Sequence, residues 1–263
     1  MISDIFSGLA PEPGKLSVCR LGQHSFLIKG GKLLIAIDPF LSEKESRLIP
    51  PLVSAEKFTG VNLILCTHDH SDHLDRSSLA AMAAASPDAL FIVPEAIRRT
   101  VTEIPADRII GINDGEELEF DDITIRGIAS AHEFLDRTAQ GLYPYLGYIV
   151  TMNDVTFYHS GDCCVYDGLL PLLKDAEPDL MMLPINGRDA KRYAANCIGN
   201  MTYQEAADLA GWCWVKCVIP AHYDMFAGNT EDPQLFLDYM AVKYPQIKAE
   251  KLDPGEIRIL KLK

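Results

Sequence analysis

Residues 63–73 have the sequence LILCTHDHSDH, in which an apolar run passes directly into a dense group of metal-ligand side chains. The apolar run is typical of a buried strand. Among the residues that follow it, the candidate ligands are His68, His70, Asp72 and His73. Because side chains two apart in an extended chain share a face, His68 and His70 can converge on one ion. Asp72 and His73 lie at the turn into the next predicted helix, where they can face a second ion.

The density of histidines in this stretch points to metal binding. Three of the chain's seven histidines fall within six residues, and an ordinary polar loop between a strand and a helix does not explain that concentration. Imidazole and carboxylate ligands that leave coordination positions open are typical of a catalytic metal rather than a structural one. The sequence therefore predicts a metal-dependent hydrolase.

The pattern His-x-His-x-Asp-His after an apolar strand resembles the signature of the metallo-β-lactamase superfamily. The resemblance implies three later ligands, and the chain holds a suitable residue at each expected place: His132, Asp162 and His222. His132 is similar to the third histidine on the family's first metal, Asp162 to the bridging carboxylate, and His222 to the last ligand of the second metal. Each follows a predicted strand, and ligands at strand ends can meet at one edge of a packed sheet pair.

The resemblance also implies the roles of these residues. The expected metal ligands are His68, His70, Asp72, His73, His132, Asp162 and His222, and they hold one or two divalent ions, Mn²⁺ or Zn²⁺. Asp72 and Asp162 are the expected catalytic residues, with Asp162 orienting the nucleophile between the metals. The expected nucleophile is a hydroxide from bound water whose pKa the ions lower toward about 7.

Two histidines and one aspartate outside this set have more than one interpretation. His24 begins an early strand and suits either a contact to substrate or a hydrogen bond that supports a ligand. His159 lies at a strand end, where packing or support of a ligand is expected. Asp38 ends the strand predicted at 32–38, and it suits either an ordinary turn or a hydrogen bond that orients a ligand histidine.

Three further segments resemble the branch of the superfamily that contains L-ascorbate-6-phosphate lactonase: GQHSFLI at 22–28, LPINGRD at 183–189 and NCIGNMT at 196–202. The resemblance implies opening of a sugar-phosphate lactone. The candidate substrate-binding residues are His24, Asn186, Arg188, Lys191, Arg192 and Asn200. Arg188 is the expected phosphate fork, and the two asparagines are amide donors. For Lys191 and Arg192, a solvated cluster of loop charges is an equal alternative.

Two alternatives to a lactonase stay open. The same centre suits a metal-dependent phosphodiesterase or a phospholipase-D-like hydrolase, because the same nucleophile can attack phosphorus. A non-catalytic metal-binding protein is the alternative from a different class.

Charge and composition narrow the possible partners. The formal net charge of −13 repels nucleic-acid backbones and anionic membranes, so we expect neither as a partner. A small anionic substrate would need a local positive centre, which two metal ions supply. Neither a membrane-spanning run nor a secretory signal is evident, which predicts a cytoplasmic protein with reduced cysteines. Trp212 and Trp214 suit either the core or the interface of a homo-oligomer.

The pattern of apolar residues predicts an α+β fold, with one domain over residues 1–263. Strands are expected at 16–21, 25–29, 32–38, 61–67, 89–93, 108–110, 117–120, 123–128, 148–152, 155–158, 180–183, 216–220 and 257–261. Helices are expected at 74–85, 95–101, 166–174, 202–211 and 233–243. Two β-rich halves with interleaved helices favour sheet packed on sheet with helices outside, and the resemblance implies the four-layer αββα sandwich of the metallo-β-lactamase fold.

Overall fold

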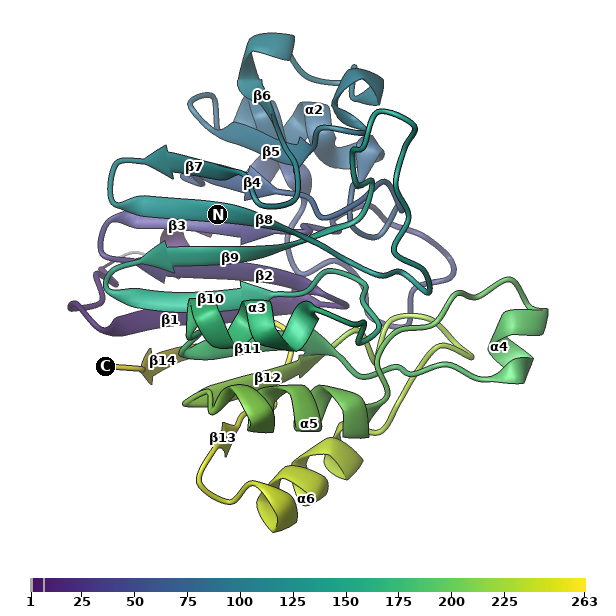
Figure 1. Cartoon of the computed structure of the whole chain (residues 1–263). Coiled ribbons are helices and arrows are strands. Elements are labelled where there is room, and N and C mark those ends of the chain that lie inside the picture. The colour runs from purple at the N-terminus through teal and green to yellow at the C-terminus, as the bar shows by residue number, and fades with distance from the viewer. Residues whose placement is uncertain (1, 7) are drawn as a thin grey trace.

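Two seven-stranded sheets face each other in the computed structural model, which describes residues 2–6 and 8–263 (Figure 1). In spatial order, the first sheet contains β14 (Ile257–Lys261), β1 (Lys15–Gly22), β2 (Ser25–Gly30), β3 (Leu33–Ile37), β4 (Leu63–Leu65), β5 (Leu90–Pro94) and β6 (Ile109–Ile112). The second contains β13 (Lys248–Ala249), β12 (Cys217–Ala221), β11 (Leu180–Pro184), β10 (Val155–His159), β9 (Leu146–Met152), β8 (Ile123–Ala129) and β7 (Glu117–Phe120).

The main core lies between the two sheets. Strand residues alternate between the two faces of a sheet, so every second side chain of β1 and β8 points inward. Leu16 of β1 and Ile125 of β8 both belong to this core, as do the fully buried rings of Phe26 and Phe157. Full burial of such a side chain stabilises the fold by roughly 1.5–3 kcal/mol, so this core holds the two sheets together.

Helices cover the outer faces of both sheets, which gives four layers in the order α, β, β, α. On the first sheet, α2 (Arg76–Ala85) buries Leu79 and Met82 against the outward side chains of the strands. On the second sheet, α3 (Leu169–Ala176), α5 (Tyr203–Cys213) and α6 (Pro233–Lys243) form one cluster with it (Figure 1). The predicted αββα sandwich is confirmed.

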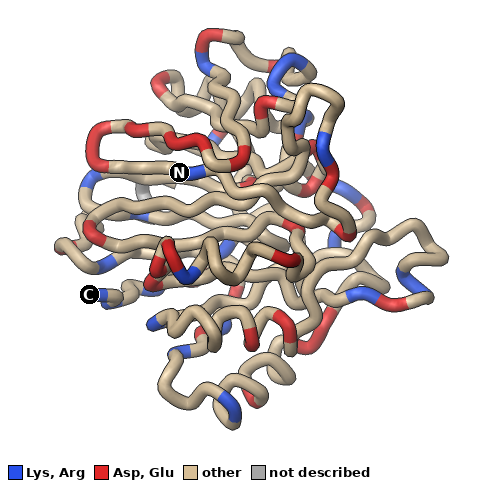
Figure 2. The backbone as a smooth tube through the Cα atoms, viewed as in Figure 1, with Lys and Arg blue, Asp and Glu red and all other residues tan. Residues whose placement is uncertain are grey.

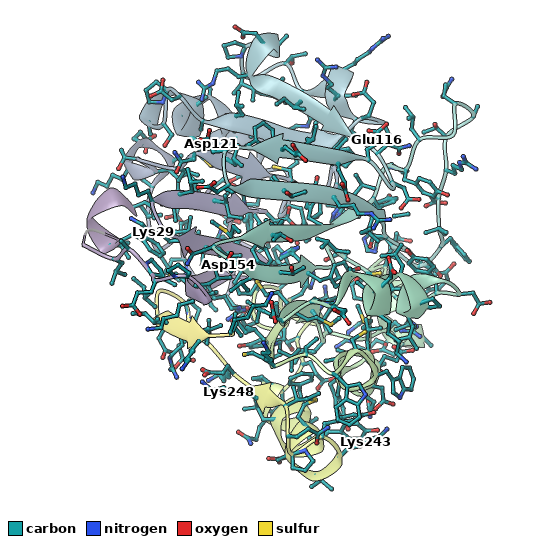
Figure 3. The ribbon with its side chains drawn as sticks, turned by 60° about the vertical axis from the view of Figure 1, so that its left-hand side comes forward. Lys29, Glu116, Asp121, Asp154, Lys243 and Lys248 are labelled. Carbon is teal, nitrogen blue, oxygen red and sulfur yellow. The ribbon has the colours of Figure 1, made fainter. Side chains whose placement is uncertain are left out.

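Parallel pairing brings several strand ends to one edge of the sandwich. The neighbours β3, β4 and β5 are parallel, and so are β10, β11 and β12. Their carboxyl ends, and the loops that follow them, lie together on the right in Figure 1. The β7–β8 and β9–β10 hairpin turns, which contain Asp121 and Asp154, lie at the other end, whereas Glu116 precedes β7 at the loop end (Figure 3).

Some predicted elements differ from those observed. The helix predicted at 95–101 is a series of turns with one 3₁₀ turn at Arg98–Thr100, because its backbone bonds all span three residues and β-branched Thr100 and Val101 end it. The short helices α1 (Ile2–Ile5) and α4 (Ala190–Ala194) are not among the predicted elements. In the segment expected to be a loop, Asp189 caps α4 by accepting a hydrogen bond from Arg192 N.

Acidic residues outnumber basic ones along the chain, and they are densest along β7 and the turn from β7 to β8 (Figure 2). In the described part of the chain, no helix has both the length and the apolar character needed to cross a bilayer.

Candidate metal centre

The loop after β4 presents most of the predicted ligands. Two backbone bonds to the carbonyl of His70, from His73 N at 3.0 Å and Leu74 N at 2.8 Å, fold residues 70–74 into a tight turn. The turn brings the ring of His73 back beside that of His68, with 4.1 Å between their centroids. A single loop therefore contributes ligands to two neighbouring positions.

Ligand atoms gather into two groups at this edge, and within each group they lie within 4.8 Å of one another. The first ligand group is His68, His70, His132 and Asp162. The second ligand group is Asp72, His73 and His222. The structure thus brings together all seven residues that the sequence predicted as metal ligands, from loops that follow β4, β8, β10 and β12.

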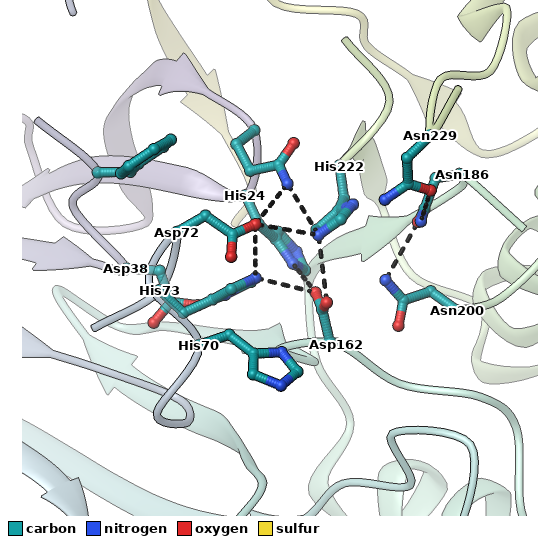
Figure 4. Close-up of polar contacts among 12 residues, drawn as sticks. His24, Asp38, His70, Asp72, His73, Asp162, Asn186, Asn200, His222 and Asn229 are labelled. Carbon is teal, nitrogen blue, oxygen red and sulfur yellow. Dashed lines mark hydrogen bonds and ion pairs between the residues drawn. The ribbon is translucent and has the colours of Figure 1, made fainter. Parts of the chain in front are cut away.

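Asp162 lies between the two groups (Figure 4). Its Oδ1 is 3.2 Å from His73 Nε2, and its Oδ2 is 3.1 Å from His222 Nε2 and 3.7 Å from His132 Nε2. Gly161 has φ +59° directly before it, and a Cβ there would lie 2.6 Å from the Leu146 carbonyl oxygen. Only glycine fits this turn, which aims Asp162 at both groups.

Unpartnered polar atoms show that the residues fit divalent ions. His68 Nε2, His73 Nε2 and Asp162 Oδ1 are buried and have no hydrogen-bond partner. Such an atom costs about 1–3 kcal/mol when nothing satisfies it. His68 and His73 use their Nδ1 atoms elsewhere, so their Nε2 atoms face the shared space. Imidazole nitrogen and carboxylate oxygen are the ligands that Zn²⁺ and Mn²⁺ accept.

Asp38 holds the second ligand group in place. Its Oδ2 is 2.7 Å from His73 Nδ1, and it also accepts hydrogen bonds from the backbone N–H and the hydroxyl of Thr67. All three groups are fully buried. A carboxylate that accepts from a ligand histidine fixes the ring and raises its basicity, so the observed contact fits the orienting role rather than that of a plain turn residue.

The two ligand groups carry different charge. Burial lowers the pKa of His132 to about 4 despite the nearby Asp162, and burial together with His73 holds the pKa of His68 well below its usual value. Burial also opposes protonation of His73, but the carboxylates of Asp162, Asp72 and Asp38 outweigh it and raise its pKa well above the usual value. The histidines of the first group therefore favour the neutral form, whereas the carboxylates around His73 favour its protonated form, with which a metal ion would compete.

His24 and His159 form a buried pair beneath the ligands. Their ring centroids are 4.0 Å apart, and His159 Nε2 donates a hydrogen bond to the backbone carbonyl of His24. His24 Nδ1 is 3.8 Å from Asp162 Oδ1, and neither residue is exposed to solvent. This placement favours support of Asp162 by His24 over contact with substrate, and packing for His159.

The predicted phosphate fork is already occupied. Arg188 forms a bidentate pair with Glu205, with both nitrogen–oxygen distances at 2.7 Å, so its planar donors face a carboxylate of this chain. Arg192 donates to the carbonyls of Asn186, Gly228 and Thr230, which gives it the role of fastening loops together. The sequence identified Arg188 and Arg192 as cationic residues but could not identify their partners, because Glu205 and residues 228–230 are distant along the chain.

Lys191 and the asparagines differ in their surroundings. Lys191 is exposed on α4. Asn186 and Asn200 are fully buried beside the centre and join Asn229 in a chain of amide hydrogen bonds, in which Asn200 Oδ1 keeps no partner (Figure 4). The asparagines are thus held by one another, and Asn200 Oδ1 is a buried acceptor without a hydrogen-bond partner.

Two residues at the site were not predicted. Gln23 places its amide nitrogen 2.7 Å from Asp72 Oδ2 and 3.0 Å from His222 Nε2. Tyr145 packs its half-buried ring at 5.3–5.4 Å from the rings of His68 and His132. Gln23 lies in the GQHSFLI segment, and the resemblance of that segment to the lactonase branch could have pointed to it. No motif in the sequence pointed to Tyr145.

Comparison with known proteins identifies the family of the chain. Residues 34–223 match the model of the beta-lactamase superfamily domain. A UPF0173 metal-dependent hydrolase of Pyrococcus horikoshii is 31% identical over 238 residues, covering 90% of this chain and 96% of that protein. The chain belongs to the UPF0173 metal-dependent hydrolases of the metallo-β-lactamase superfamily. A second UPF0173 hydrolase, from Pyrococcus furiosus, is also 31% identical and covers 92% of this chain and 98% of the relative.

Solved structures show the same metallo-β-lactamase fold. Igni18, a metallo hydrolase from Ignicoccus hospitalis, has a TM-score of 0.73 at 22% identity and covers 95% of this chain and all of that one. An isothiocyanate hydrolase from Delia radicum gut bacteria has a TM-score of 0.72 at 17% identity, over 92% of this chain and 98% of that one. This UPF0173 hydrolase thus shares its architecture with hydrolases of the superfamily.

Proposed function

We propose that this UPF0173 hydrolase opens a small lactone, such as a sugar-phosphate lactone, at a centre of two Mn²⁺ or Zn²⁺ ions. The observation that carries the proposal is the pair of ligand groups with Asp162 between them. Their unpartnered nitrogen and oxygen atoms face one another in a buried space. When bound, a pair of divalent ions lowers the pKa of water toward about 7 and polarises a carbonyl or phosphoryl oxygen.

The chain's own residues supply orientation and a proton acceptor. His222 and His73 lower the pKa of Asp162 well below its usual value, which more than offsets the effect of burial, so this carboxylate stays ionised. Its Oδ1 makes no hydrogen bond within the chain, although His73 Nε2 lies 3.2 Å away, and it can accept a hydrogen bond from the attacking water. Hydrolysis adds the oxygen of water to the acyl carbon, breaks the bond to the ring oxygen, and leaves that oxygen protonated.

The substrate is proposed to be a small anion. Two divalent ions contribute four positive charges, and Asp72, Asp162 and a hydroxide remove three, so a net charge of about +1 faces an otherwise acidic surface. The occupied fork of Arg188 weakens the case for a phosphate contact at that residue. A lactone carbonyl needs only the centre itself, and Asn200 Oδ1 can accept from a sugar hydroxyl.

A substrate panel on metal-loaded protein tests the proposal. L-ascorbate-6-phosphate and other phosphorylated sugar lactones are compared with unphosphorylated lactones, bis-(p-nitrophenyl) phosphate and an isothiocyanate, with products followed by NMR. We expect lactone turnover that His70→Ala and Asp162→Ala each reduce by at least about a hundredfold. Turnover of the phosphodiester alone favours a phosphodiesterase, and metal binding without any turnover favours a metal-binding protein.

Arg188→Met separates the two possible roles of that residue. If Arg188 binds the substrate phosphate, the variant raises KM for phosphorylated lactones only. If it serves only its pair with Glu205, KM is unchanged and the variant loses thermal stability. The geometry favours the second result.

A further inference from the structure

The side chain of Gln23 lies on the ligand atoms of the second ligand group, and none of the metal-ligand assignments above uses it. Its amide nitrogen is within hydrogen-bond distance of both Asp72 Oδ2 and His222 Nε2, at 2.7 Å and 3.0 Å. The residue is 1% exposed. The carboxamide therefore occupies the same small region toward which these two ligand atoms point.

The backbone of Gln23 is held in an unusual conformation that sends the side chain into the centre. Its φ is +51°, in the left-handed region that non-glycine residues seldom adopt. Its carbonyl accepts hydrogen bonds from His222 N at 3.0 Å and from fully buried Arg20 at 3.3 Å, and its N–H donates to Asp224. Arg20 also pairs with Asp224 at 2.5 Å. Strain that so many contacts maintain is typical of a functional site.

The chemistry of a carboxamide changes when a cation occupies this position. Its nitrogen has only donors, and its oxygen has two lone pairs. In the structure, the nitrogen faces two acceptor atoms. A divalent ion would take up the lone pairs of Asp72 and His222 and would repel the N–H groups. Rotation about the last side-chain bond exchanges nitrogen for oxygen without moving the rest of the residue.

We propose that the carboxamide oxygen of Gln23 is a ligand of the second metal position and sets its preference for Mn²⁺. This inference rests on the metal-dependent function proposed above. With Gln23, the second position has oxygen from Asp72, Asp162 and Gln23 beside two imidazoles, whereas the first has three imidazoles and one carboxylate. Oxygen ligands suit Mn²⁺, and imidazole suits Zn²⁺. The two positions of this chain therefore differ in metal preference.

Metal titration of Gln23 variants tests the inference without using activity. Gln23→Met keeps the length of the side chain and removes the hard oxygen, and Gln23→Glu keeps an oxygen and adds charge. Mn²⁺ and Zn²⁺ binding is measured by calorimetry, with free Mn²⁺ followed by electron paramagnetic resonance. Gln246→Ala, at an exposed turn residue, is the matched control, and circular dichroism verifies that each variant is folded.

We expect Gln23→Met to weaken Mn²⁺ binding at the second position by about tenfold or more. The same variant should change Zn²⁺ binding at the first position little. Gln23→Glu should retain Mn²⁺ binding. If Gln23→Met binds both metals as the wild type does, the inference is wrong while the proposed function stands. If Gln23→Met does not fold, Gln23→Glu decides: loss of Mn²⁺ binding there means that Gln23 acts only as a hydrogen-bond donor. A wild-type chain that binds no divalent metal overturns the proposed function itself.

Discussion

Among single residues, the histidines of the two ligand groups differ most in charge. His68 and His132 are neutral near pH 7 because burial lowers the pKa of each, and the pKa of His132 falls to about 4. His73 and His222 are surrounded by carboxylates, which raise the pKa of both in spite of burial. A metal ion must displace protons from the second ligand group but not from the first.

This difference predicts unequal proton release. The raised pKa of His73 means that its proton is bound below that pKa, so metal affinity at the second group rises with pH through the neutral range. We expect about one proton released per ion there and almost none at the first group. Calorimetry in two buffers of different ionisation enthalpy measures the release. His68→Ala disrupts the first ligand group and leaves the second to be measured, and His222→Ala does the reverse. Equal release from both variants would contradict the assignment.

Asp38 is a second single residue on which metal affinity should depend. Asp38→Asn keeps the shape and tolerates the φ of +48°, but it removes the charge that faces His73. Loss of such a supporting carboxylate lowers metal affinity by about 10–100-fold. Metal titration checks this, and Asp75→Asn is a comparison, because Asp75 accepts from the Leu41 and Ser42 N–H groups and not from a ligand. An unchanged affinity in Asp38→Asn would refute the orienting role.

Among the elements, α5 shows how a sequence signal fixes a helix near the site. Thr202 and Glu205 form a capping box, in which the threonine hydroxyl accepts from Glu205 N and the glutamate side chain accepts from Thr202 N. Glu205 also holds Arg188. One helix start therefore fastens the loop that carries Asn186 and Asn200 beside the metal centre.

The cap predicts a modest and local loss of stability. Thr202→Ala removes the acceptor for one helix N–H, and we expect it to lower the free energy of unfolding by about 1 kcal/mol. Thr202→Ser keeps the hydroxyl and should lose less. Urea unfolding monitored by circular dichroism compares the two variants with the wild type. An equal loss in both would show that the methyl group, rather than the cap, matters.

For the whole molecule, metal binding and folding are coupled. The ligands come from loops after β4, β8, β10 and β12, which belong to both sheets, so ions at the centre connect the two halves of the sandwich. An ion that binds only the folded chain stabilises it by about 2.7 kcal/mol at a free concentration of 100 Kd.

The stability of the fold should therefore follow metal concentration. We expect chelation to lower Tm and added Mn²⁺ or Zn²⁺ to raise it, as measured by differential scanning calorimetry. Asp162→Asn, which removes the shared carboxylate, should show a much smaller rise. If Tm is the same with and without metal in the wild-type chain, the two ligand groups do not bind ions in the folded protein.

The sequence by itself predicted the αββα sandwich, and its resemblance to the metallo-β-lactamase superfamily named the seven residues expected as ligands. Strand periodicity and a histidine-rich loop are local signals, and ligands at the ends of strands such as β10 and β12 need only parallel pairing to converge. Their occupation by metal stays a prediction. The sequence alone could not show that Arg188 pairs with Glu205, that Asp38 contacts His73, or that Gln23 lies on Asp72 and His222. Those contacts join residues 17 to 199 positions apart, and only the tertiary arrangement of the loops decides which polar groups meet; of these contacts, the one between Gln23 and His222 also connects the two sheets.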